Sequence, residues 1–206
     1  LSDNKNHLLE DLLSPYQIRE SDFSEEQKNA KNILEIGFGF GDFLFEKAKQ
    51  NSNQNFFGFE PHINGVVNLL AKLQQEPLKN LKISTQDVRL ILSEKAQEFF
   101  DEVYILFPDP WPKSKHFKRR LINKDFLDFL ASKMKPNSNL IIATDHDSYK
   151  TWILSAIVQN NNFNWLAESK SDWQNFPSWW TETKYQKKAA LEGRISVIFK
   201  LQKCLS

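Results

Sequence analysis

Three glycines at alternate positions follow a short apolar run and are the first residues whose spacing suggests chemistry. The segment reads Glu-x-Gly-x-Gly-x-Gly over residues 35–41, and a helical pattern follows over residues 42–50. Glycine lacks a Cβ, so its backbone can adopt positive φ and approach a ligand closely. A strand, a glycine-rich turn and a helix in this order are typical of a nucleotide-binding α/β unit, although a plain strand-to-helix loop has the same pattern. We therefore predict that Gly37, Gly39 and Gly41 bind a nucleoside cofactor.

Four carboxylates fall at or just after the ends of expected strands. They are Glu35, Glu60, Asp87 and Asp109. In an open α/β sheet the ligand lies outside the carboxyl ends of the strands. Glu60 lies about twenty residues beyond the glycines, where a carboxylate can accept both ribose hydroxyls, and Asp87 is placed to accept from an adenine amino group. An acid-lined pocket suits the positive sulfonium of S-adenosylmethionine better than a pyrophosphate, so we expect that cofactor rather than a dinucleotide.

A second candidate loop reads Phe-Pro-Asp-Pro-Trp-Pro-Lys over residues 107–113. The prolines on either side of Asp109 restrict the backbone and hold its carboxylate at the mouth of the expected pocket. Residues 113–120 then carry five cations and no acid. Such a run beside a candidate active-site loop favours contact with phosphates, and the alternative is a solvated charged face.

These residues are positioned by an alternation of expected strands and helices. The strands are residues 32–36, 55–60, 81–85, 102–107, 139–144, 165–169 and 195–201, and the helices are residues 42–50, 66–75, 89–99, 127–134 and 148–160. Regular alternation predicts a doubly wound, mostly parallel sheet. No obvious helix separates the last two strands, so we expect an antiparallel C-terminal strand. We interpret residues 1–31 as an N-terminal arm and residues 32–206 as one domain.

Composition limits the class of protein. The chain has 206 residues and a net charge of +1, and no stretch is apolar for long enough to predict a membrane helix. The lone Cys204 excludes an intramolecular disulfide and a cysteine-rich metal cluster, which favours the cytoplasm and no metal. The chain begins with Leu rather than Met, so its true N-terminus stays open.

The motifs together resemble one known family. They are Leu-Glu-Ile-Gly-Phe-Gly at residues 34–39, Phe-Glu-Pro-His at residues 59–62, the loop at residues 107–113, His-Phe-Lys-Arg-Arg at residues 116–120, Ala-Thr-Asp at residues 143–145 and Thr-Lys-Tyr at residues 183–185. This set is similar to that of the bacterial tRNA (guanine-N7-)-methyltransferases over about residues 32–200. The resemblance implies a Rossmann-like class I methyltransferase fold, S-adenosylmethionine as cofactor and tRNA as partner. The resemblance does not extend to the N-terminal arm. The oligomeric state does not follow from these motifs, and we favour a monomer.

The resemblance also implies residue roles. Asp109 would be catalytic and would contact the cofactor together with Glu35, Gly37, Gly39, Gly41, Glu60 and Asp87. Substrate would be held by Lys113, Asp145, Thr183, Lys184, Tyr185 and Gln186. From the charge run itself, we predict that Lys115, His116, Lys118, Arg119 and Arg120 bind RNA. The family usually reads Thr-Lys-Phe-Glu in this motif, whereas residues 183–186 of this chain read Thr-Lys-Tyr-Gln. The change to Gln removes a charge that could pair with the edge of guanine.

Two other functions remain open from the residues. Guanine N7 carries a lone pair and no proton, so its methylation needs alignment and charge stabilisation rather than a general base. An amino-group methyltransferase of nucleic acid or protein would carry an Asn/Asp-Pro-Pro-Tyr loop, of which residues 109–112 are a loose relative. A non-catalytic RNA-binding scaffold with the same fold is the third interpretation, and a titration with S-adenosylmethionine would separate it from the enzymes.

Overall fold

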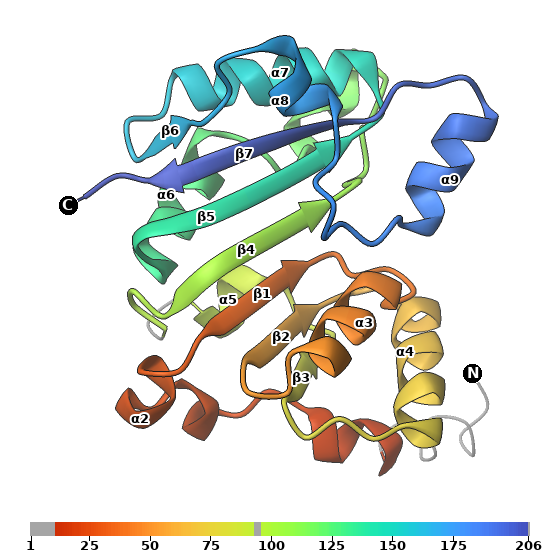
Figure 1. Cartoon of the computed structure of the whole chain (residues 1–206), viewed down its shortest axis with the longest axis vertical. Helices are drawn as coiled ribbons and strands as arrows, with labels where there is room; N and C mark the ends of the chain where they lie inside the picture. The colour runs from red at the N-terminus through yellow and green to blue at the C-terminus, as the bar shows by residue number, and fades with distance from the viewer. Residues whose placement is uncertain (1–10, 93–95, 206) are drawn as a thin grey trace. The chain divides into compact units, whose positions relative to one another are not determined.

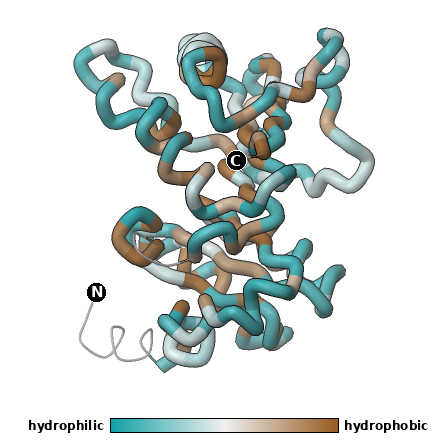
Figure 2. Tube along the Cα trace, turned by 90° about the vertical axis from the view of Figure 1, so that its left-hand side faces the viewer, coloured by the Kyte–Doolittle hydropathy of each residue, from teal (hydrophilic) through white to brown (hydrophobic). Residues whose placement is uncertain are grey.

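The structure is a computed structural model that describes residues 11–92 and 96–205. Two compact units make up the chain, Leu1–Ala96 and Gln97–Ser206 (Figure 1). This division differs from the predicted boundary between an arm and a domain at residue 31, which stays a prediction. No helix within the described residues is both long and apolar enough to cross a membrane. Hydrophobic residues recur in short stretches along the trace (Figure 2).

The first unit is built on three parallel strands in the order β3-β2-β1. Its elements are β1 (Asn32–Ile36), α3 (Asp42–Gln50), β2 (Asn55–Phe59), α4 (Ile63–Gln75), β3 (Leu81–Ser84) and α5 (Val88–Leu92). All five residues of β1 are buried, as expected for a parallel strand that is covered on both faces. The carboxyl ends of these strands therefore meet at one edge, and the predicted cofactor residues other than Asp109 lie there.

The segment before β1 packs on the first unit from residue 14 onward. It forms η1 (Ser14–Tyr16), η2 (Glu20–Phe23) and α2 (Glu25–Lys28). The backbone N–H of Ile18 donates to the carbonyl of Ile83 at 2.9 Å, and the Phe23 and Phe57 rings stack at 5.6 Å. The hydrogen bond from Ile18 covers part of the outer edge of β3, where unpaired backbone groups would otherwise be open to another chain. Residues 11–13, just before η1, are helical.

The second unit has strands in the order β4-β5-β7-β6. Its strands are β4 (Phe100–Leu106), β5 (Met134–Thr144), β6 (Phe163–Trp165) and β7 (Val197–Lys203), and its helices are η3 (Ser114–Arg119), α6 (Lys124–Lys133), α7 (Asp147–Val158), α8 (Lys170–Gln174) and α9 (Lys184–Leu191). β4 and β5 are parallel, whereas β7 is antiparallel to both β5 and β6. The prediction of an antiparallel C-terminal strand is thus confirmed.

Three details differ from the sequence-based expectation. The helix predicted over residues 89–99 is described only as α5, which ends at Leu92; residues 93–95 lie outside the description, and β4 has already begun at Phe100. The sixth strand lies at Phe163–Trp165 rather than at residues 165–169. Two short helices, α8 and α9, occupy the stretch where no helix was expected. They are fixed by caps at Ser169 and Thr183 and bury few side chains, so they show no amphipathic pattern.

Candidate functional site

The glycine turn between β1 and α3 requires glycine for two reasons. Gly37, Gly39 and Gly41 have φ values of 77°, 54° and 73°, which L side chains rarely adopt. A Cβ on Gly41 would also meet the Leu69 side chain at 2.9 Å. A Cβ on Gly37 would meet nothing within 4 Å, so open space lies in front of that position. The backbone of the turn is therefore accessible to a ligand at Gly37.

Glu60 ties this turn to the end of β2. Its Oε2 accepts from the backbone N–H of Gly39 and its Oε1 from that of His62, each at 2.8 Å. The residue is only 4% exposed. Each carboxylate oxygen has a further lone pair, so ribose hydroxyls can still donate to Glu60. The sequence suggested the ribose contact but not this second task of holding the turn.

Gly65 on α4 is a site residue that sequence reasoning missed. A Cβ at this position would lie 2.2 Å from the carbonyl oxygen of Gly39 and 3.2 Å from Cγ of Glu60. The helix can therefore approach the glycine turn only because residue 65 has no side chain. The predicted helix began at residue 66, one position after this glycine, whereas α4 includes Gly65; a glycine inside a helix, which normally costs stability relative to alanine, would have been the signal.

Glu35 is buried beside the turn, and one of its two carboxylate oxygens has no hydrogen-bond partner in the described part of the chain. It is 2% exposed, and its Oε2 finds no hydrogen-bond partner among the residues that the structure describes. Burial raises the pKa of Glu35 to about 8, and the negative charges of Glu60 and Asp42 add to the shift. A buried acceptor without a partner costs free energy unless a ligand satisfies it. Glu35 is therefore positioned to accept from a donor or a cation on a bound molecule.

Asp87 is more exposed and already carries a counter-ion. Its Oδ1 accepts from both the backbone N–H and the Nε of Arg89, at 2.8 and 2.9 Å. These hydrogen bonds, led by that from the Arg89 side chain, lower the pKa of Asp87. A ligand amino group would have to share the carboxylate with Arg89, and the adenine contact predicted for Asp87 stays a prediction.

In the second unit, the Pro-Asp-Pro-Trp loop leaves β4 through a tight bend. Phe107 and Trp111 have positive φ values of 55° and 42°, and the N–H of Phe107 donates to the carbonyl of Ala143 at 2.8 Å. Between these two points, Asp109 is exposed to solvent. A non-glycine residue with positive φ is uncommon, and such strain is most often kept at functional sites.

The basic run after this loop divides into two parts. Lys115, Lys118 and Arg119 are exposed, and the Arg119 guanidinium lies 4.9 Å from the Trp111 ring, on which His116 also packs. Arg120 is only 2% exposed. The RNA contact of Arg120 therefore stays a prediction, and the structure shows only that its guanidinium donates its hydrogen bonds within the second unit.

Asp145 follows β5 and is paired. Its Oδ2 lies 2.9 Å from Nε of Arg194, and 19% of its side chain is exposed. Arg194 also lies 2.6 Å from Glu192. Sequence reasoning missed Arg194, which sits just after a glycine and outside any motif. Asp145 thus has part of its charge compensated within the protein.

The predicted substrate segment begins helix α9. The Thr183 hydroxyl caps the helix by accepting from the backbone N–H of Gln186 at 3.1 Å. The side-chain oxygen of Gln186 accepts from Nε1 of Trp180 at 2.7 Å. Lys184 and Tyr185 are exposed, Tyr185 by 47%. The cap therefore fixes where these side chains leave the helix.

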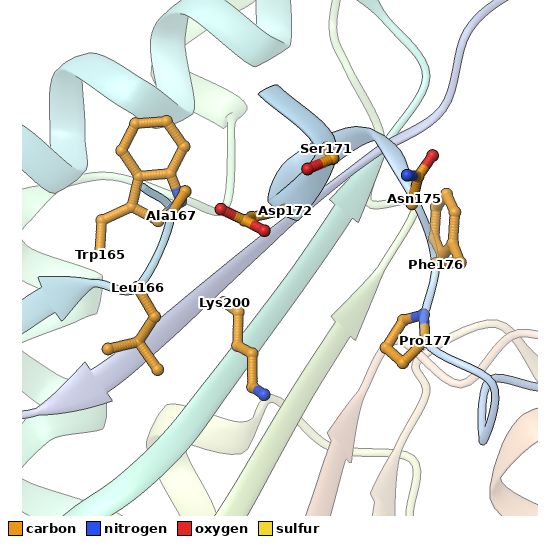
Figure 3. A pocket seen from close by; sticks show the side chains of 9 residues that line it. All are labelled: Trp165, Leu166, Ala167, Ser171, Asp172, Asn175, Phe176, Pro177 and Lys200. Carbon is orange, nitrogen blue, oxygen red and sulfur yellow. The ribbon is translucent and has the colours of Figure 1, made fainter. Parts of the chain in front are cut away.

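A cavity of about 580 Å³ lies elsewhere in the second unit, between α8 and β7 (Figure 3). It is lined by Trp165, Leu166, Ala167, Ser171, Asp172, Asn175, Phe176, Pro177 and Lys200, none of which is a predicted site residue. Across residues 11–92 and 96–205, no group of three or more His, Cys, Asp or Glu side chains could hold a metal ion.

Comparison with protein families and curated proteins gives a consistent result. A family described as "Putative methyltransferase" matches residues 29–198. The protein named tRNA (guanine-N(7)-)-methyltransferase from Rhizobium etli is 35% identical over 170 residues, covering 82% of this chain and 74% of that protein. Proteins of the same name from Roseobacter denitrificans and Hyphomonas neptunium are 39% and 34% identical, over 78% and 91% of this chain and 69% and 88% of theirs.

Solved structures support the fold. An antibiotic-related methyltransferase matches with a TM-score of 0.60 at 16% identity, covering 94% of this chain and 98% of that one. A SAM-dependent O-methyltransferase from Thermotoga maritima matches with a TM-score of 0.55 at 11% identity, over 100% of this chain and 67% of that one. The predicted class I, mostly parallel methyltransferase fold is confirmed.

Proposed function

Because the chain belongs to the family of tRNA (guanine-N(7)-)-methyltransferases, we propose that it transfers a methyl group from S-adenosylmethionine to N7 of a guanine in tRNA. The observation that carries the proposal is the extent of the match. Residues 29–198 include the glycine turn, the four acids at strand ends, the Pro-Asp-Pro-Trp loop and the start of α9. A tRNA substrate also favours the cytoplasm as the site of action.

The residues of the first unit suit S-adenosylmethionine. When bound, this cofactor supplies a methyl group on a positively charged sulfur. The unpartnered Oε2 of buried Glu35 can accept from the cofactor's ammonium group or face its positive charge. Glu60 can receive the ribose hydroxyls, and the glycine turn leaves space for the nucleoside. We propose that Asp87 accepts from the adenine amino group while it also accepts from Arg89.

The residues of the second unit suit a guanine that reacts without losing a proton. The N7 lone pair forms the new N–C bond as the S–CH₃ bond breaks, and the purine ring takes over the positive charge. Asp109, on its restrained loop, would stabilise that charge and orient the base. Asp145 would accept from the N1–H and amino group of guanine, with Arg194 limiting its excess charge.

We propose that the remaining predicted residues hold the RNA around this base. Lys113, Lys115, His116, Lys118 and Arg119 form a basic surface, which we call the η3 basic surface, next to the Asp109 loop. Trp111 contacts both Arg119 and His116, and its ring would stack on a base. Thr183, Lys184, Tyr185 and Gln186 would contact the nucleotide from the start of α9.

Two measurements test this proposal against its alternatives. Titration with S-adenosylmethionine should show saturable binding, and absence of binding would favour a non-catalytic scaffold. Incubation with labelled cofactor and, separately, total tRNA, duplex DNA and a protein extract should place the label in tRNA. Label in DNA or protein, with none in tRNA, would favour an amino-group methyltransferase.

A further inference from the structure

Arg120 is a buried cation within a basic run whose neighbours face solvent. A guanidinium that leaves water is costly unless the protein supplies hydrogen bonds or other compensation. Burial lowers the pKa of Arg120, and its interaction with Tyr149 acts in the opposite direction. The contacts that compensate this cost indicate what the residue does.

Three hydrogen bonds join the guanidinium to two separate segments. Nε donates to the carbonyl oxygen of Pro110 at 2.9 Å. One terminal nitrogen donates to the carbonyl oxygen of Ser148 at 3.2 Å, and the other donates to the Ser148 hydroxyl at 2.8 Å. Pro110 directly follows Asp109, and Ser148 lies three positions after Asp145 in the first turn of α7.

Aromatic rings hold the guanidinium in this position. Its carbon lies 3.8 Å from the centre of the Phe117 ring and 5.1 Å from the centres of both the Tyr149 and Trp152 rings. These rings are themselves fixed, because the Tyr149 hydroxyl accepts from the N–H of Ile122 at 3.1 Å and Trp152 Nε1 donates to the Ile122 carbonyl at 2.6 Å. A cation enclosed by aromatic faces is stabilised and has little freedom to reorient.

We propose that Arg120 is a positioning residue that fixes Asp109 and Asp145 relative to each other. The inference rests on the proposed function, since it assumes that both carboxylates act on guanine. One planar guanidinium spans the Asp109 loop and the start of α7, and the segment after Asp145 is tied in further by the Ser148 hydroxyl, which lies 3.2 Å from Nδ1 of His146. Arginine suits this task because its donors form a rigid fork, whereas lysine offers one flexible ammonium.

The test is Arg120→Lys, with Ser148→Ala as a milder second variant. We expect Arg120→Lys to lower kcat for methyl transfer by on the order of a hundredfold, because a shift of about 1 Å in reacting groups has that effect. KM for tRNA and its salt dependence should stay nearly unchanged. Ser148→Ala, which removes one acceptor, should lower kcat by a smaller factor, and the double variant should be less than additive.

Lys203→Met is the matched control. Lys203 is also a buried cation of the second unit, and its ammonium donates to the Met134 carbonyl at 2.7 Å, at the end of β5 opposite Asp145. Its loss should lower the melting temperature without lowering kcat at 25 °C. Hydrogen exchange gives a readout that does not depend on activity: Arg120→Lys and Ser148→Ala should speed exchange at residues 107–113 and 145–149, and Lys203→Met should not.

Three results would overturn the inference. If Arg120→Lys and Ser148→Ala only lower the melting temperature, Arg120 is a core residue and nothing more. If Arg120→Lys raises KM for tRNA and reduces its salt dependence at constant kcat, Arg120 contacts phosphate after all. If Arg120→Lys fails to fold, an unchanged kcat and unchanged exchange in Ser148→Ala contradict the inference. Wild-type protein without activity on tRNA would instead refute the proposed function, and the exchange measurements would still decide the role of Arg120.

Discussion

At the scale of single residues, Glu35 links pH to both stability and cofactor binding. Its pKa rises from 4.5 to about 8 on burial, so the folded protein holds a proton that the unfolded chain releases between these values. Stability from this residue is therefore lost as pH rises from 4.5 to about 8, and Glu35→Gln should remove that loss. Chemical denaturation across this range measures it.

Cofactor binding should show the opposite trend. A positively charged cofactor favours the ionised carboxylate, so its binding should release a proton below pH 8 and tighten as the pH rises. Calorimetry in buffers with different ionisation enthalpies counts that proton. In Glu35→Gln, affinity should be lower and independent of pH. An equal pH dependence in the variant would show that Glu35 does not face the cofactor.

The hydrogen bond with Trp180 determines which way the side-chain amide of Gln186 faces. The indole N–H of Trp180 can only donate, so the carbonyl oxygen of Gln186 must face it, and the two amide N–H groups remain for other contacts. We expect them to donate to an acceptor such as guanine O6. Gln186→Glu would replace these donors with an acceptor and should lower kcat/KM by about tenfold, the cost of one hydrogen bond. A rise in kcat/KM would show that guanine presents its N1–H and amino group here.

At the scale of elements, the contact of α4 with the glycine turn leaves no room for a side chain at residue 65. Gly65→Ala puts a methyl group 2.2 Å from the Gly39 carbonyl, so the turn must move. We expect cofactor affinity to fall at least about tenfold, because the glycine turn and the Glu60 side chain that is hydrogen-bonded to it would shift together. Binding is measured by calorimetry with S-adenosylmethionine.

The control for this substitution is Gly193→Ala. Gly193 has a φ of +70° and nothing within 4 Å of an added Cβ. The variant should lose about 1 kcal/mol of stability, because an L side chain is strained at positive φ, but it should bind the cofactor as the wild type does. Unchanged affinity in Gly65→Ala would contradict the account of the turn.

The η3 basic surface is expected to contact phosphates. Neutralising Lys115, Lys118 and Arg119 to Gln should weaken tRNA binding and reduce the slope of log K against log salt by up to about 0.9 per lost contact. Cofactor affinity should not change. Neutralising three exposed lysines outside this surface, Lys79, Lys124 and Lys170, serves as the control. Equal slopes in the two triple variants would show a solvated face.

At the scale of the whole molecule, the sequence was sufficient for the alternating architecture. Buried strands such as β1 and amphipathic helices such as α4 have clear hydrophobic patterns. The antiparallel direction of the C-terminal strand was predicted because no obvious crossover helix precedes it. The short helices α8 and α9 were not predictable in this way, because their caps fix them and they bury little. Capping depends on a few hydrogen bonds that leave no hydrophobic pattern.

The same limit applies to the site. The glycine turn and the acids at strand ends follow from spacing, since parallel strands end at a common edge. Arg120 could not be separated by sequence from its exposed neighbours, because its burial depends on Tyr149 and Trp152 of α7 as well as on nearby Phe117. The pairing of Asp145 with Arg194 likewise joins residues that are distant in sequence.

The identity of the methylated nucleoside tests the central claim most directly. Total tRNA is incubated with labelled S-adenosylmethionine and the protein, digested to nucleosides and separated, with Asp109→Asn in parallel. We predict label in N7-methylguanosine, a rate that shows no base-type pKa near neutrality because N7 carries no proton, and a fall of on the order of a hundredfold in Asp109→Asn. Label in an amino-methylated nucleoside, with a rate that rises steeply from mildly acidic to neutral pH and loses that rise in Asp109→Asn, would contradict the account.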